Sequence, residues 1–183
     1  NDLKNGPYVI STPGHYCLKE DIEINFLPYK TDVWKFDSNN VFGFPAGIII
    51  NSSNVVLDLK NYSIKQSVQD YVLQRFFALI QVNDGPFIKG KGPIPGNGIE
   101  ISKPKNIIIR NGELGRTSHQ AILGNGNMNV YLENLKIRDF EVSGINMNNV
   151  TNLMISDCKI GPSNCNVPVT PLFAGLIFMF KLF

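Results

Sequence analysis

The sequence predicts an all-β protein of the solenoid type, in which short strands stack coil on coil. Three stretches that begin at Gly98, Ala121 and Gly144 align without a gap, so the sequence repeats every 23 residues. Apolar residues alternate with polar ones within each repeat. A unit this short cannot bury its own apolar face and must stack on the next unit.

The spacing of the apolar residues indicates strands rather than helices. They recur at every second position, as in Ile107 and Ile109, and no stripe at i, i+3, i+4 and i+7 extends over a full unit. Most are β-branched, as pleated and half-buried surfaces prefer. The following residues are predicted to share interior stacks: Ile99, Ile122 and Ile145; Ile107, Val130 and Leu153; Ile109, Leu132 and Ile155; Leu114, Ile137 and Ile160.

The units before these repeats are less regular. A unit that begins at Gly47 reads Gly-Ile-Ile-Ile-Asn-Ser-Ser-Asn-Val-Val-Leu-Asp-Leu and fits the template with one residue fewer in its first turn. The span from there to Gly98 accommodates one irregular coil and an excursion. Residues 76–82 are a candidate strand for this coil, and an irregular loop is expected at 68–97, where Gly and Pro cluster after residue 84.

The repeated pattern Gly-Ile-x-Ile…Asn-Ile-x-Ile-x-Asn…Ile is clearest at 106–112, which reads Asn-Ile-Ile-Ile-Arg-Asn-Gly. It resembles the coils of the pectin-lyase-like superfamily. The opening Gly6-Pro-Tyr-Val-Ile…Gly14-His-Tyr-Cys-Leu-Lys-Glu-Asp-Ile resembles the strands that often precede such coils, so the similarity covers about residues 6–163. The resemblance implies a right-handed parallel β-helix with about 23 residues per coil. It carries over no catalytic residue, because the coil motif is architectural.

The chain of 183 residues, 43% hydrophobic, is long enough for one core and short for two. Residues 1–167 are therefore expected to form the β-helix domain. Residues 168–183 are expected to form an apolar tail, in which Lys181 is the one charged residue. The tail is too short to span a bilayer, which needs about 20 apolar residues. It is predicted either to cap the last coil or to dock on another chain, with Phe178 and Phe180 among the contact residues.

Charge and cysteine content exclude several classes of function. The formal net charge is +2, from 17 basic and 15 acidic residues, and no Lys/Arg run marks a nucleic-acid-binding surface. Cys17, Cys158 and Cys165 are too few and too unevenly spaced for a disulfide framework or a four-ligand zinc site. No cofactor, metal, nucleic acid or membrane span is expected, and Cys158 is predicted to be a buried thiol.

Asparagines recur at the turns of the repeat and are first explained by the fold. They form two columns, Asn106, Asn129 and Asn152, and Asn111, Asn134 and Asp157. Asn and Asp tolerate left-handed backbone conformations and bond their own backbone. Stacked on successive coils, about 4.8 Å apart, their amides are predicted to form hydrogen-bonded ladders.

Polar residues between the apolar positions are predicted to face outward. Ion pairs between neighbouring coils, Arg110 with Glu133 and Glu113 with Lys136, are expected to use most of the charges. The nearest approach to a catalytic group is Arg116, His119 and Asp139, beside Arg138, because a histidine next to a carboxylate can act near neutral pH. The paired carboxylates of a glycoside hydrolase and the acidic cluster of a polysaccharide lyase are absent from the sequence.

Three functions are compatible with this sequence. The preferred hypothesis is a non-catalytic structural module that docks with protein neighbours in an oligomer or larger assembly, such as a virion or an extracellular surface. The alternatives are a carbohydrate-active enzyme, either lyase or hydrolase, and a glycan-binding module. Polysaccharide would be the partner in both alternatives. The residues proposed for binding are Tyr71, Phe76, Phe77 and Phe87 of the loop, Tyr131 on the outer face, and Phe178 and Phe180 of the tail.

Overall fold

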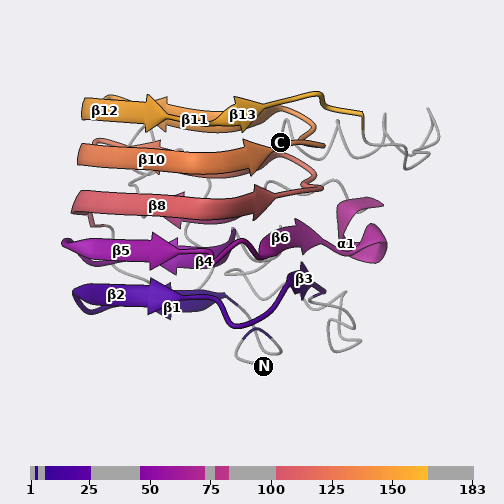
Figure 1. The fold of residues 1–183 in the computed structure, drawn as a ribbon, viewed down its shortest axis with the longest axis horizontal. Helices are drawn as coiled ribbons and strands as arrows, with labels where there is room; N and C mark the ends of the chain where they lie inside the picture. Colours follow the sequence, from indigo (N-terminus) through magenta and orange to yellow (C-terminus); the bar gives the residue numbers. More distant parts are fainter. Residues whose placement is uncertain (1–2, 4–6, 26–45, 73–76, 83–101, 165–183) are drawn as a thin grey trace, which may run out of the picture.

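The computed structural model describes residues 3, 7–25, 46–72, 77–82 and 102–164, and the strands of these residues form two sheets (Figure 1). Sheet A contains, in spatial order, β1 (Tyr8–Ile10), β4 (Ala46–Ile50), β7 (Ala78–Val82), β9 (Gln120–Asn125) and β11 (Ser143–Asn148). Sheet B contains β2 (Gly14–Cys17), β5 (Val55–Asp58), β8 (Lys105–Leu114), β10 (Met128–Ile137) and β12 (Thr151–Ser156), and beside them β3 (Ile22–Ile24), β6 (Ser63–Gln66) and β13 (Lys159–Ile160).

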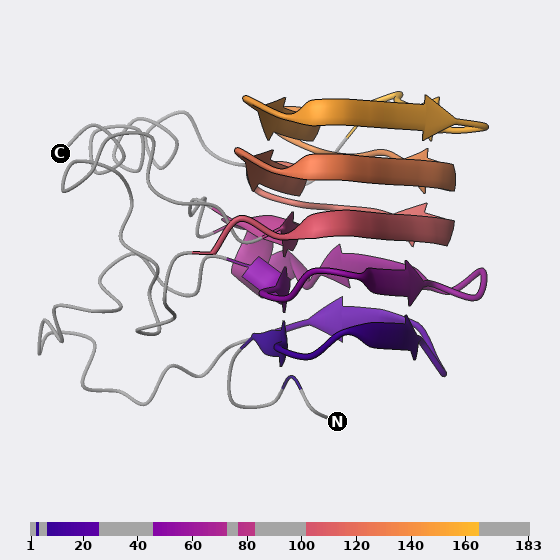
Figure 2. The ribbon, with the colours of Figure 1, turned by 90° about the vertical axis from the view of Figure 1, so that its left-hand side faces the viewer.

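Every strand pair is parallel, and in each layer the chain contributes one strand to sheet A and then one or two strands to sheet B. The strands therefore lie in layers, from the N-terminal β1 and β2 to the C-terminal β11 and β12 (Figure 2). In the last layers the partners are 23 residues apart, as in Ile107 with Val130 and Ile122 with Ile145. The prediction of an all-β protein is confirmed, and its sheets are parallel.

The layers before β8 do not follow this spacing. Ile122 pairs on its other side with Ile80 of β7, and Ile107 pairs with Val55 of β5. The position predicted for Ile99 beside Ile122 is thus taken by Ile80, while Ile99 itself lies outside the described residues. Additional residues can be inserted between two strands without changing their pairing, because pairing requires only that each strand lie in register beside its neighbour in the sheet.

Within the segment 68–97, where an irregular loop is expected, the structure describes two regular elements. Residues Val68–Val72 form the helix α1, whose first turn is capped by Ser67, because the backbone N–H of Asp70 donates to the Ser67 Oγ at 3.1 Å. Residues Ala78–Val82 form β7, in the middle of sheet A and buried along its whole length. The suggestion that 76–82 supplies a strand is thereby confirmed over β7.

The core consists of apolar columns that run from layer to layer. In sheet B one column is Tyr16, Leu57, Ile109, Leu132 and Ile155, and another is Ile22, Ile64, Leu114, Ile137 and Ile160. The middle members are almost fully buried, and each contributes about 1.5 to 3 kcal/mol relative to exposure. The predicted stacks that include Leu132 and Ile137 are confirmed.

One glycine is required by close packing between layers. A Cβ added at Gly112 of β8 would lie 2.4 Å from the Cβ of Leu59 and 2.6 Å from the carbonyl oxygen of Tyr62. The later layers have Leu135 and Cys158 in register with this position. Glycine is needed at residue 112 because the turn between β5 and β6, which contains Leu59 and Tyr62, packs directly against β8 at this position.

Candidate functional site

Two asparagine ladders hold the turns of sheet B. In the first, the side-chain amides of Asn106, Asn129 and Asn152 each donate at 2.8 Å to the amide oxygen of the preceding member, starting from Asn54. All four have positive φ, between 56° and 59°. The predicted ladder is confirmed, with Asn54 as an additional member, and its role is to maintain the fold.

The second column also forms a ladder, which ends on a carboxylate. Asn134 donates to Asn111 at 3.1 Å, and Asn111 donates to both carboxylate oxygens of Asp58 at 3.2 Å. Asn111, Asn134 and Asp157 all have positive φ, as predicted. Structural asparagines therefore account for the most repetitive polar residues of the chain.

Replacing Asn129 with alanine is expected to lower the free energy of unfolding by about 1–2 kcal/mol, because alanine is strained at φ 56° and two ladder hydrogen bonds are lost. Asn129→Gly is the matched control, since glycine adopts this φ freely and loses only the amide. Urea unfolding measures both. Equal losses for the two variants would contradict a contribution from the backbone conformation.

Asp58, at the end of β5, has the most elaborate polar environment in the described residues. Its side chain is 2% exposed and accepts hydrogen bonds from the Arg110 Nε at 3.0 Å, the Lys60 backbone N–H at 3.0 Å and Asn111. The Lys60 Nζ and the His15 Nε2 lie 4.0 and 3.9 Å from its Oδ2. Burial raises the pKa of Asp58, but the hydrogen bonds from Lys60, Asn111 and Arg110 outweigh it and lower the pKa overall.

The ion pairs differ from those expected from the sequence. Arg110 lies beside Glu133, and Glu113 lies beside Lys136, as the register predicts. The guanidinium of Arg110, however, pairs with Asp58, and that of Arg138 pairs with Glu113. The hydrogen bond to Glu113 raises the pKa of Arg138. Asp58 and Glu133 lie in register with Arg110 on either side of β8, and the guanidinium binds the carboxylate of Asp58, which is the buried one.

The three candidate catalytic residues lie in neighbouring turns, and the side chains of Arg116 and Asp139 have different partners. Arg116 donates through Nε and Nη2 to the carbonyl oxygen of Gln66, at 3.0 and 2.7 Å. The carboxylate of Asp139 lies 3.5 Å from the Arg138 Nη1 and accepts from the Asn164 backbone N–H at 3.2 Å. His119 is half-buried, and its carbonyl oxygen accepts from the backbone of Val142 and Ser143. These contacts stabilise turns, so the arrangement offers no acid–base pair built from Arg116 and Asp139.

The aromatic residues proposed for binding are divided by the structure. Tyr71 of α1 and Phe77 are buried, so they belong to the interior and not to a binding surface, which corrects the prediction for both. Tyr131 of β10 is half-buried on the outer face, between Ile108 and Met154 of the adjacent strands. Phe76, Phe87, Phe178 and Phe180 lie outside the described residues, as do Cys165 and the tail 168–183.

The described cysteines are not arranged as a reactive or metal-binding group. Cys158 is half-buried, and its thiol lies 3.2 Å from the carbonyl oxygen of Ser156 and 3.5 Å from that of Leu132. Cys17 is exposed on β2. Among the residues that the structure describes, no three His, Cys, Asp or Glu side chains are placed to hold a metal ion. Within the same residues, no helix has the length and apolarity that crossing a membrane requires.

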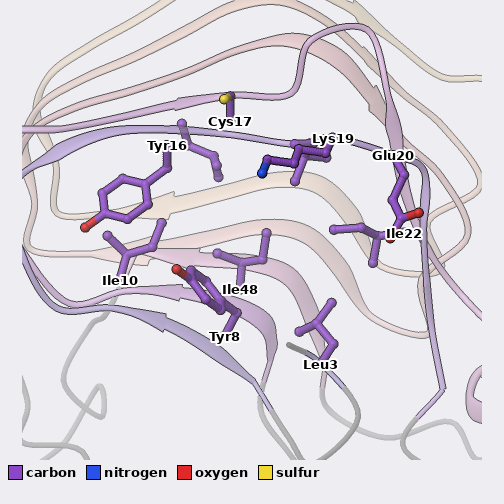
Figure 3. A pocket seen from close by; sticks show the side chains of 11 residues that line it. Leu3, Tyr8, Ile10, Tyr16, Cys17, Lys19, Glu20, Ile22 and Ile48 are labelled. Atoms are coloured by element: carbon purple, nitrogen blue, oxygen red, sulfur yellow. The ribbon is translucent and has the colours of Figure 1, made fainter. Parts of the chain in front are cut away.

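The N-terminal end of the stack contains a hollow of about 290 Å³ (Figure 3). Aliphatic side chains of the core line it, among them Ile10, Ile22 and Ile48, with the rings of Tyr8 and Tyr16 beside them and Lys19 and Glu20 at its edge. The Tyr16 hydroxyl donates to the carbonyl oxygen of Thr12 at 2.9 Å, which holds the ring in place. Within the described residues, the hollow thus lies at the N-terminal end of the apolar interior, and no repeat in the sequence predicts it.

The C-terminal end of the stack is also apolar. Leu153 and Ile155 of β12 and Ile160 of β13 are 39%, 44% and 48% exposed. Their partners one layer earlier, Val130, Leu132 and Ile137, are fully buried. Residues of the interior columns are therefore exposed at this end, which makes it the largest concentration of exposed aliphatic side chains in the described part of the chain.

Comparisons of this chain with protein-family models, with curated proteins and with solved structures find no match. The described residues themselves carry the information on function, namely two apolar ends of the stack and a set of charged residues that contact turns and strands.

Proposed function

We propose that this chain is a non-catalytic structural module, a right-handed parallel β-helix of the pectin-lyase-like kind with about 23 residues per coil. The observation that carries the proposal is the exposure of Leu153, Ile155 and Ile160 at the C-terminal end, where the interior columns end without a cover in the described residues. A cluster of exposed core residues is typical of a surface that another protein covers. The module would thus serve in a larger assembly, such as a virion or an extracellular surface.

Two further observations support this role. The 23-residue offset of β8, β10 and β12 and the uniformly parallel pairing support the β-helix. The charged residues that would serve an enzyme, Arg116 and Asp139, have structural partners in the turns. Two of the three candidate catalytic residues therefore have a role in the fold.

A glycan-binding module is the second candidate, because Tyr131 presents an aromatic ring on the outer face between Ile108 and Met154. An aromatic side chain in an apolar stripe suits the face of a sugar ring. In this case Tyr131→Ala should abolish any glycan-induced rise in melting temperature, and the proposed structural role would lose its support.

The exposed end is tested by a pair of variants on one strand. Ile155 and Met154 of β12 are similarly exposed, at 44% and 49%, but only Ile155 belongs to an interior column. Ile155→Glu is expected to stay folded, with a melting temperature within about 3 °C of wild type, and to be more soluble, because an exposed end contributes little to the fold itself. Met154→Glu is the control. A fall of about 10 °C for Ile155→Glu alone, measured at a dilution where the wild type is monomeric, would show that the fold of a single chain depends on this end, and would contradict docking there.

The absence of catalysis is tested on uronate polymers, with and without calcium, by following unsaturated products. No product is expected from the wild type. Product formation that is lost in His119→Ala or Asp139→Asn, with the melting temperature unchanged, would instead establish a carbohydrate-active enzyme.

A further inference from the structure

We propose that copies of this chain stack head to tail, with the C-terminal end of one copy (β11, β12 and β13) on the N-terminal end of the next (β1, β2 and β3). The inference rests on the proposed assembly role and identifies the partner as a second copy. The register of the columns, the direction of the edge strands and the charges at the two ends support this contact.

The apolar columns that reach the two ends are the same columns. One column begins with Tyr16 at the N-terminal end and finishes with Ile155 at the C-terminal end. A second column begins with Ile22 and finishes with Ile160. Moving a second copy along the stack axis by the height of the module therefore places Ile155 against Tyr16 and Ile160 against Ile22. Tyr16 and Ile22 both line the N-terminal hollow, which can receive the exposed aliphatic side chains.

The edge strands have the direction that such a stack requires. β1 and β2 are the first strands of sheets A and B, and β11 and β12 are the last, and all pairs within both sheets are parallel. In a copy translated along the stack axis, β1 would pair with β11 of the first copy and β2 with β12, and both pairs would be parallel. Open strand edges bind other strands readily, so a partner that extends the ladder satisfies their N–H and C=O groups.

Charges at the two ends are complementary in this arrangement. One outward column runs from Ser63 through Glu113 and Lys136 to Lys159 at the C-terminal end. At the N-terminal end it begins with Asp21, whose carboxylate accepts hydrogen bonds from the Ser63 backbone N–H at 2.7 Å and hydroxyl at 3.0 Å. Stacking would bring Lys159 of one copy next to Asp21 of the other, an opposite-charge pair at the rim of an apolar contact. Because the two faces differ, the contact is heterologous and produces rings or open stacks.

The experiment uses the full chain with one end blocked at a time. Ile155→Glu blocks the C-terminal end, and Tyr8→Glu blocks the N-terminal end, where Tyr8 is 38% exposed on the edge strand β1 and lines the hollow. The wild type is expected to have a mass by light scattering that is a multiple of the monomer mass of 20.4 kDa. Each blocked variant should be monomeric, with strand content retained by circular dichroism, and Met154→Glu should assemble like the wild type.

The decisive sample is an equimolar mixture of the two blocked variants. Each retains one intact end, so the mixture is expected to form a one-to-one dimer with twice the monomer mass. Lys159→Asp should weaken wild-type association by roughly 2- to 5-fold, and the double variant Asp21→Lys with Lys159→Asp should restore it.

Three outcomes would overturn the proposal. A monomeric wild type would show that something other than a second copy, such as the chain's own tail or a different protein, covers the end. Association of Tyr8→Glu with itself would show that like ends meet. A mixture that stays monomeric while the wild type assembles would reject the head-to-tail contact and leave the assembly role standing. The proposed function itself fails by the separate measurement of polymer cleavage.

Discussion

Replacing Leu132 with aspartate is expected to unfold the protein. Leu132 is fully buried in β10, between Ile109 and Ile155 of the neighbouring strands, and it belongs to the main hydrophobic cluster. A carboxylate in this column would have only aliphatic neighbours above and below it. An unpaired buried charge costs several kcal/mol, which is comparable with the total stability of about 5–15 kcal/mol of a typical domain.

The effect is measured by circular dichroism and by urea unfolding. The matched control is Met128→Asp, which places the same charge at the start of the same strand, where Met128 is 38% exposed. We expect the control to stay folded with a change within about 0.5–1 kcal/mol, as for most surface substitutions. A soluble Leu132→Asp variant with wild-type stability would contradict burial of this column.

Removing the carboxylate of Asp58 should produce the second largest loss of stability. Asp58→Ala leaves Arg110 without its partner and removes the acceptor of the Lys60 N–H and of the Asn111 amide. The Arg110 side chain is 35% exposed, so water can solvate its charge after Asp58 is removed. We therefore expect the free energy of unfolding to fall by about 2–3 kcal/mol, less than for a fully buried ion pair. Glu133→Gln, which removes a carboxylate from the adjacent outward position, is the control and should cost less.

The dependence on pH follows from the lowered pKa of Asp58. A carboxylate whose pKa is lower in the folded than in the unfolded state, where it is about 3.9, stabilises the fold above that pH. The contribution is lost as the pH falls through the folded pKa. The stability of the wild type should therefore fall more steeply below about pH 5 than that of Asp58→Asn, and the two curves should converge in acid. The free energy of unfolding of both proteins is measured by urea unfolding at a series of pH values. If the two plots against pH run parallel, Asp58 does not cause the loss of stability in acid.

Much of the C-terminal half was predictable because its determinants are local and periodic. The apolar columns through Val130, Leu132 and Ile137 and the ladder through Asn129 repeat at the interval at which the strands pair. The Asn residues combine a tolerance for positive φ with an amide that both donates and accepts, so their position in the repeat indicates both the turn and the ladder.

The Asp58 site was not predictable in the same way. Its partner Arg110 follows it by 52 residues, an interval that contains β6, α1, β7 and residues outside the described part of the chain. The 23-residue period places Arg110 beside Glu133 and says nothing about which earlier strand lies on its other side. The burial of Tyr71 and Phe77 was also not predictable, because no repeat covers them and the Gly- and Pro-rich sequence after residue 84 suggested a loop, whereas α1 and β7 pack into the fold.

The sequence by itself determined the strand class, the parallel stacking of the later units and the asparagine turns, because each follows from residue types repeated at a fixed interval. Only the tertiary structure decided that β7 pairs with β9 and that Arg110 binds Asp58. It also decided that, among the described residues, the interior columns end in exposed apolar side chains at the C-terminal end and in an apolar hollow at the N-terminal end. The physical reason is that two strands separated by an insertion pair only if the chain brings them side by side in space. The exposure of a residue at the end of a column likewise depends on whether another segment covers it. A repeat that is local in sequence specifies neither.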